Sequence, residues 1–103
     1  MYINLNSKVM ENLYYTRIEK EVVPSLSFHK ELDLDQHDDI IQRLEKATLL
    51  GNIHHSKVII YFQDDEGPKK VETTIWATGT KFICLKGGMW IPISRILDVE
   101  YVS

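Results

Sequence analysis

The second half of the chain alternates between apolar and polar positions with a period of two. Runs rich in β-branched and aromatic residues are separated by short stretches that contain Gly, Asp, Pro or Ser, and they cover residues 57–63, 71–78, 81–86, 89–93 and 96–102. Successive side chains of a strand point to opposite faces of a sheet, so this period predicts strands. The short connections favour antiparallel neighbours. This half of the sequence therefore predicts five short antiparallel strands.

A helical period precedes these strands, over residues 35–50. The apolar residues fall on one face of a helix, at Ile40, Ile41, Leu44 and Ala47 or Thr48. Asp35 is the expected N-cap, and the negative charges of Asp38 and Asp39 suit the first turn. Gly51 followed by Asn52 is a typical stop signal. We therefore expect one amphipathic helix that ends before the first strand.

The length of 103 residues favours one domain with a single hydrophobic core. Residues 35–103 are expected to form an α+β unit, a small five-stranded antiparallel barrel capped by one N-terminal amphipathic helix. Closing the sheet removes the exposed strand edges that it otherwise leaves. Residues 1–34 show no sustained period, so we expect an arm that is partly disordered or holds an edge strand at 22–28. Pro24 excludes a central position for that strand.

Several segments carry a resemblance to known families: Leu49-Leu50-Gly51-Asn52, Lys70-Val71-Glu72-Thr73-Thr74-Ile75-Trp76, Lys86-Gly87-Gly88 and Ile91-Pro92-Ile93. These four look like segments of a group of small proteins of Bacteroidetes bacteria, a match that implies no function. The order of helix, loop and five strands resembles that of Sm-like small barrels, and within them the Rho inhibitor Rof and its relatives. Sm-like relatives bind RNA or proteins, so this resemblance implies a binding role. The U-tract-binding residues of Sm proteins have no counterpart here.

The net charge of −3 is spread unevenly along the chain. Residues 1–53 carry six Lys or Arg against nine Asp or Glu, whereas residues 54–103 carry six against six. A protein that binds duplex DNA normally presents a basic face, so duplex DNA is not an expected partner. A short single strand bound to the neutral half is compatible with this balance.

The cellular compartment is predicted from the apolar runs and from the single cysteine. No run approaches the ~20 apolar residues of a membrane span, and the first residues lack the apolar core of a signal peptide. Cys84 cannot form an internal disulfide, and its apolar neighbours indicate an inert core thiol. We expect a cytoplasmic protein of bacterial type with no membrane partner.

Candidate catalytic and metal-binding residues lack the spacing that these functions need. His54 and His55 are adjacent, so on a strand they point to opposite faces and cannot chelate one ion. Asp64-Asp65-Glu66 lacks the alternating oxygen ligands of a calcium loop. Ser94 has no nucleophile-elbow motif around it, and Cys84 has no paired base. We therefore expect no enzymatic activity, no metal and no cofactor.

Aromatic residues are the remaining candidates for a site. Trp76 and Tyr61 fall on the opposite side of their predicted strands from the main apolar positions. If they are exposed, they can stack on bases or anchor a protein partner, with Lys57, Lys81 and Arg95 as nearby cations. The alternative is that the helix and the N-terminal arm cover both rings.

These observations predict a non-catalytic small-barrel binding module. RNA-associated regulation is the first hypothesis. The second is a protein-protein adaptor or a homo-oligomeric structural protein that binds no nucleic acid. Lysines gathered around Trp76 or Tyr61 favour the first hypothesis, and scattered lysines beside an apolar patch favour the second.

Overall fold

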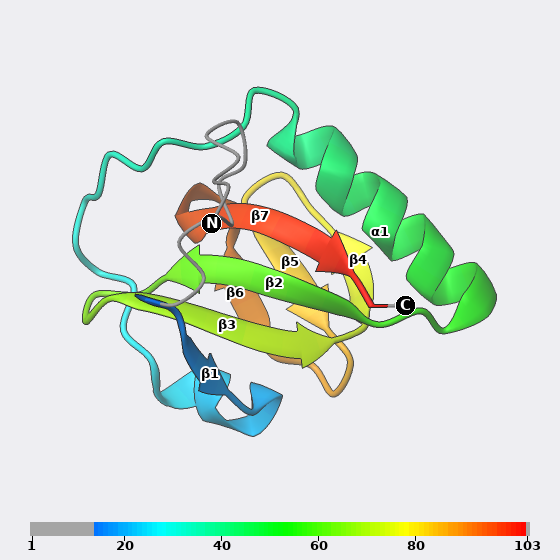
Figure 1. The fold of residues 1–103 in the computed structure, drawn as a ribbon, viewed down its shortest axis with the longest axis horizontal. Helices are drawn as coiled ribbons and strands as arrows, with labels where there is room; N and C mark the ends of the chain where they lie inside the picture. Colours follow the sequence, from blue (N-terminus) through cyan, green and yellow to red (C-terminus); the bar gives the residue numbers. More distant parts are fainter. Residues whose placement is uncertain (1–13, 103) are drawn as a thin grey trace, which may run out of the picture.

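Two β-sheets and one long helix enclose one hydrophobic core in the computed structural model, which describes residues 14–102 (Figure 1). The first sheet has the strand order β1-β3-β2-β7, with bounds Thr16–Ile18, Pro68–Thr73, Val58–Gln63 and Ile96–Tyr101. The second has the order β4-β5-β6, with bounds Ile75–Thr78, Phe82–Leu85 and Trp90–Pro92. Helix α1 spans Ile40–His54, and two 3₁₀ helices, η2 and η3, span Lys20–Ser25 and Ile93–Arg95.

The chain is α+β, but the predicted five-stranded barrel with an N-terminal helix is wrong. Residues 14–102 form seven strands in two separate sheets, and α1 follows β1 and η2. The run 71–78, predicted as one strand, is divided at Thr74 between β3 and β4. Thr74 is buried at this corner: its Oγ1 donates to the Ser56 carbonyl at 3.1 Å, and its carbonyl accepts from the Lys86 N–H at 2.9 Å. These bonds allow the backbone to cross from one sheet to the other.

The segment before residue 35 also differs from the prediction. Its strand is β1, which pairs parallel to β3 from Thr16 opposite Lys69 to Ile18 opposite Val71. The predicted edge strand at 22–28 is absent, because Pro24 lies within η2. Val23 of η2 is buried in the core. Residues 1–13 of the expected arm lie outside the described residues.

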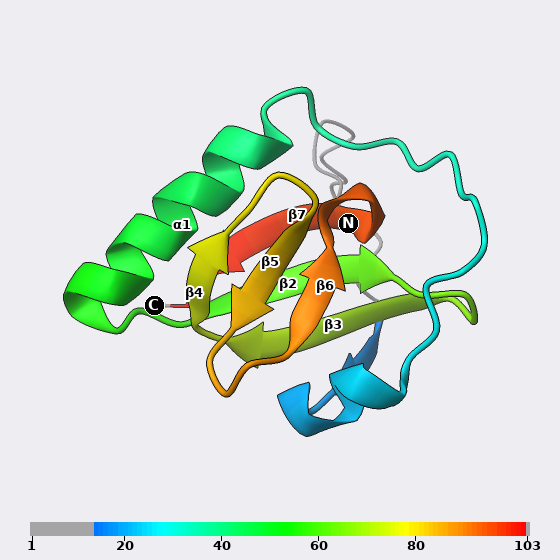
Figure 2. The same cartoon turned by 180° about the vertical axis from the view of Figure 1, so that it is seen from behind.

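Helix α1 lies along the edge strands of both sheets, β7 of the first and β4 of the second (Figures 1 and 2). Ile40, Leu44 and Ala47 are buried beneath it, as the helical period predicts. Ile41 is 37% exposed, so the apolar face is narrower than predicted. The helix begins after Asp39 rather than at Asp35.

Gly51 lies within α1 instead of ending it, and its role is close packing. A Cβ atom at this position would lie 2.9 Å from Thr74 Cγ2 and 3.0 Å from the Ile75 carbonyl oxygen. The helix passes so close to the β3–β4 corner that a side chain has no room there. The helix ends at His55, whose φ of 55° is left-handed and whose N–H donates to the Gly51 carbonyl at 2.9 Å.

Gly51→Ala is therefore expected to destabilise the protein by about 1–2 kcal/mol, because the backbone carbonyl of Ile75 must shift to admit the methyl group. Helix propensity alone predicts the opposite sign. Urea unfolding followed by circular dichroism measures the change. Asn52→Ala, at the next and exposed position, is the control and should leave stability unchanged or slightly raised. An increase in stability for Gly51→Ala would contradict the packing role.

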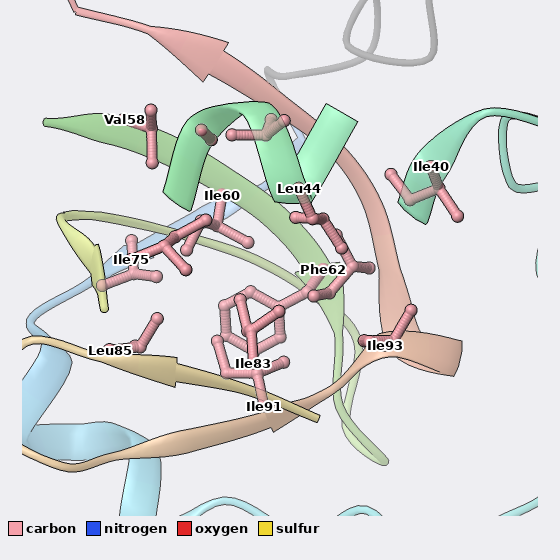
Figure 3. Close-up of a cluster of buried hydrophobic side chains, with 14 of the residues drawn as sticks. Ile40, Leu44, Val58, Ile60, Phe62, Ile75, Ile83, Leu85, Ile91 and Ile93 are labelled. Atoms are coloured by element: carbon pink, nitrogen blue, oxygen red, sulfur yellow. The ribbon is translucent and has the colours of Figure 1, made fainter. Parts of the chain in front are cut away.

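The hydrophobic core fills the space between the two sheets and α1 (Figure 3). Phe62 and Ile60 enter it from β2, and Ile83 and Ile91 enter from the second sheet. All four side chains are completely buried. Each strand buries one face against the other layer, so alternate side chains of a strand enter the core.

A strap of irregular backbone joins η2 to α1 and runs past the β6 side of the second sheet (Figure 2). Asp65, in the β2–β3 loop, holds it: the carboxylate accepts from the N–H groups of His29 and Lys30 at 2.8 and 3.1 Å. The carboxylate also accepts from Arg95 Nη2 at 2.7 Å. Burial by itself raises the pKa of Asp65, but the Arg95 guanidinium and the N–H donors outweigh it and hold that pKa well below its usual range.

Candidate functional site

Of the five residues predicted for a binding site, two are buried and three are exposed. The Tyr61 side chain is 1% exposed, its ring packs edge-on against Tyr15 with centroids 5.0 Å apart, and its hydroxyl donates to Glu100 Oε1 at 3.2 Å. Arg95 is 3% exposed. Trp76 is 48% exposed, and Lys57 and Lys81 are also exposed. The structure therefore does not bring the five together on one surface.

Arg95 has a structural role that its buried position explains. Its guanidinium donates to three oxygens from separate segments: the Gln63 carbonyl at 3.1 Å, the Lys30 carbonyl, and Asp65 Oδ1 at 2.7 Å. It also lies over the Phe28 ring, 5.7 Å from the centroid. The donors of the Arg95 guanidinium are therefore used in contacts inside the protein, and this group is not exposed to a ligand.

The second sheet has one face against the core and one outer face, and Figure 2 views the sheet from its outer side. Several aromatic residues belong to this outer face. Residues opposite one another on antiparallel strands share a face. One cross-strand row consists of Ala77, Cys84 and Trp90, and the next pairs Phe82 with Pro92. We call this surface, with Trp76 added, the aromatic face; it consists of Trp76, Ala77, Phe82, Cys84, Trp90 and Pro92.

Trp76 joins this face through an irregularity in β4. The pairing shifts between Ile75, opposite Leu85, and Ala77, opposite Cys84. Two residues of β4, Trp76 and Ala77, therefore stand against Cys84, as in a β-bulge, and both are exposed. Strict alternation predicts Ala77 on the same face as Ile75, which is buried, so the bulge moves Ala77 outward.

Three large rings of the aromatic face are half exposed: Trp76 at 48%, Phe82 at 45% and Trp90 at 56%. Trp90 and Phe82 are diagonal neighbours across β5 and β6, a relation that brings long side chains within reach of each other. The sequence prediction missed Phe82 and Trp90. The available signal was their position out of phase with Ile83, Leu85 and Ile91, which are buried.

The charged residues that the second sheet and its turns contribute are all positive. Residues 73–97, which include the whole second sheet, contain no Asp or Glu, and their charged residues are Lys81, Lys86 and Arg95. Arg95 is neutralised by Asp65, so two lysines remain. Lys81 precedes β5 and Lys86 follows it, and both are exposed. Each end of β5 therefore carries an ammonium group.

A second polar cluster joins the strap to β7 on the other side of the fold. Asp98 Oδ2 lies 3.2 Å from His37 Nε2, and Asp98 Oδ1 accepts from Arg43 Nη1 at 3.0 Å. Arg43 Nε also donates to Asp39 Oδ1 at 2.9 Å. These contacts link the start of α1 to β7, a structural role. Within residues 14–102, no group of three or more His, Cys, Asp or Glu side chains is arranged to hold a metal ion.

Comparisons with protein-family models, with curated proteins and with solved structures give no match to this chain. The resemblance to the Bacteroidetes group therefore stays a prediction. In the part of the chain that the structure describes, no helix has the length and apolar character needed to cross a membrane.

Proposed function

We propose that the chain is a non-catalytic cytoplasmic module that binds single-stranded RNA on the aromatic face. The observation that carries this proposal is the set of three half-exposed rings, Trp76, Phe82 and Trp90, on three adjacent strands. Single exposed apolar residues are common on protein surfaces, whereas a cluster of large ones marks a binding surface. Flat rings on a sheet are stacking positions for bases, because every base has a π-face.

Two lysines beside the aromatic face support a nucleic acid as its ligand. Lys81 and Lys86 lie at the two ends of β5, and no carboxylate occurs between residues 73 and 97. Over the rest of the chain, Asp and Glu outnumber Lys and Arg. The phosphates of a bound strand can contact Lys81 and Lys86 while its bases contact the rings.

The strand must be single because the bases of a duplex are already stacked on one another. Their faces become available to protein rings only where the strand is unpaired. The three rings offer stacking positions for roughly two or three bases, the number that a small sheet engages in other single-strand binders. The modest count of lysines also excludes the extended phosphate contacts that duplex binding requires.

Intrinsic fluorescence tests this proposal directly, because both tryptophans of the chain, Trp76 and Trp90, belong to the aromatic face. We expect mixed-sequence oligoribonucleotides to quench this fluorescence at low salt. Trp90→Ala should weaken binding about tenfold or more, since stacking contributes ~1–3 kcal/mol per base. Fluorescence anisotropy of labelled RNA provides the affinity of the variant.

Tyr101→Ala is the matched control, because Tyr101 is a similarly exposed ring (44%) on β7 of the other sheet. We expect its affinity for RNA to equal that of the wild type. A parallel titration with single-stranded DNA of the same sequence shows whether the 2′-hydroxyl contributes. If neither RNA nor single-stranded DNA changes the fluorescence at high micromolar concentration, the proposal is wrong, and contact with a protein partner becomes the better explanation of the aromatic face.

A further inference from the structure

We infer that a polar cavity beside the aromatic face holds a backbone phosphate of the strand that stacks there. The inference rests on the proposed function. The cavity has a volume of about 260 Å³ and lies between η2, the start of β2, the end of β3 and the β5–β6 turn. It is lined by Glu19, Lys20, Glu21, Lys57, Glu72, Thr73, Thr74 and Lys86.

Three lysines from separate parts of the sequence line this cavity. Lys20 comes from η2, Lys57 directly precedes β2, and Lys86 follows β5. None of them forms an ion pair within residues 14–102. The same lining contains Glu19, Glu21 and Glu72, so carboxylates partly offset the repulsion among the three ammonium groups. A bound anion would offset the positive charge that remains after these carboxylates are counted.

The glutamates of the cavity reduce this positive charge without cancelling it. Glu72 Oε1 is paired with Arg17 Nη2 at 3.2 Å, so its charge is compensated from outside the cavity. Glu19 and Glu21 remain against three ammonium groups. The net charge of the lining is therefore positive by one, which suits the single negative charge of a phosphodiester rather than a multiply charged anion.

Lys86 connects the cavity with the aromatic face. Its backbone N–H donates to the Thr74 carbonyl at 2.9 Å, two residues before Trp76. In the β5–β6 hairpin, Cys84 pairs with Trp90 and the Leu85 N–H donates to the Met89 carbonyl at 2.7 Å, so Lys86 follows directly after this pairing. A strand stacked on Trp90 that continues past this turn enters the cavity.

Lys81 fixes the other end of the same path. Lys81 and Lys86 are five residues apart along β5, which corresponds to about 16 Å of extended chain. The bound strand would run from Lys81 across Phe82 and Trp90 to Lys86, with its last phosphate between Lys20 and Lys57. This path assigns base stacking to the sheet and phosphate binding to its two ends.

The test compares two double variants that remove the same charge: Lys20→Gln with Lys57→Gln in the cavity, and Lys46→Gln with Lys70→Gln outside it. We expect the cavity variant to bind an oligoribonucleotide about five- to tenfold more weakly at low salt, and the control variant less than twofold. The slope of log affinity against log salt should fall in magnitude by about 0.7 in the cavity variant, the value for one phosphate of a single strand. Thermal melting confirms that both variants fold.

The outcomes separate this inference from the proposed function. If the wild type binds no RNA, the proposed function fails. If Trp90→Ala weakens RNA binding but the cavity and control variants bind alike, the proposed role of the aromatic face is retained and the phosphate site is wrong.

A third experiment adds inorganic phosphate to the protein alone, at constant ionic strength. Should phosphate raise the melting temperature of the wild type but not of the cavity variant, while RNA affinity is equal in both, the cavity binds free phosphate and the inference is overturned.

Discussion

Leu44→Asp is expected to lower the free energy of unfolding by more than about 4 kcal/mol, which is most of the stability of a typical small domain. Leu44 is completely buried where α1 covers the space between the two sheets. The substitution removes apolar contacts and places a carboxylate in the apolar cluster that contains Ile40, Ala47 and Phe62, where an unpaired charge is costly. We expect the variant to be largely unfolded at 25 °C, as measured by circular dichroism and urea titration.

Leu49→Asp is the control, because it makes the same chemical change five residues further along α1, at an exposed position. Leu49 is 58% exposed, so the new carboxylate stays in water. Its stability should lie within about 0.5 kcal/mol of the wild type. An equal decrease in the free energy of unfolding for both variants would indicate that α1 tolerates no acidic residue at either position. That result would contradict the packing of this helix against the sheets.

The second large effect is expected for Arg95→Ala, at about 3–5 kcal/mol, because the substitution breaks a buried pair and leaves its partners without a donor. Three segments meet at this guanidinium: the end of β2 through the Gln63 carbonyl, the strap through the Lys30 carbonyl, and the β2–β3 loop through Asp65. Arg95→Lys should restore only part of the stability, since an ammonium group lacks the planar fork that reaches all three. Thermal and urea unfolding measure both variants.

The exposed ion pair of Arg17 with Glu72 serves as the control for the buried pair of Arg95 with Asp65. The Arg17 side chain is 55% exposed, so Arg17→Ala should cost only about 0–1 kcal/mol. A similar cost for Arg17→Ala and Arg95→Ala would show that the contacts of Arg95 add little to stability and would make Arg95 available for other roles.

Arg95 also links the stability of the fold to the aromatic face. It lies in η3, directly after β6, and β6 carries Trp90 and Pro92. The contacts of Arg95 with the strap and the β2–β3 loop hold the end of β6 in place. Arg95, which the sequence predicts as a cation for ligand binding, therefore supports the strand that carries Trp90 instead.

The sequence by itself determined the elements with strong local periods. The helical spacing of Ile40, Leu44 and Ala47 predicted the buried face of α1, and alternation predicted the shared apolar face of β2. It also placed Trp76 away from the main apolar positions, and Trp76 is exposed. These predictions succeed because they depend on the direction of each side chain relative to its own backbone, which the period fixes.

Only the tertiary structure decided how these elements are combined. The break at Thr74 depends on hydrogen bonds to Ser56 and Lys86, and β1 depends on a partner more than fifty residues away, so no local pattern contains either. The same holds for the site. Tyr61 is buried by Tyr15 and Glu100, Arg95 by the strap, and the register of three strands gathers Trp76, Phe82 and Trp90 on one surface. Periodicity orients a side chain, but contacts between distant segments decide what covers it.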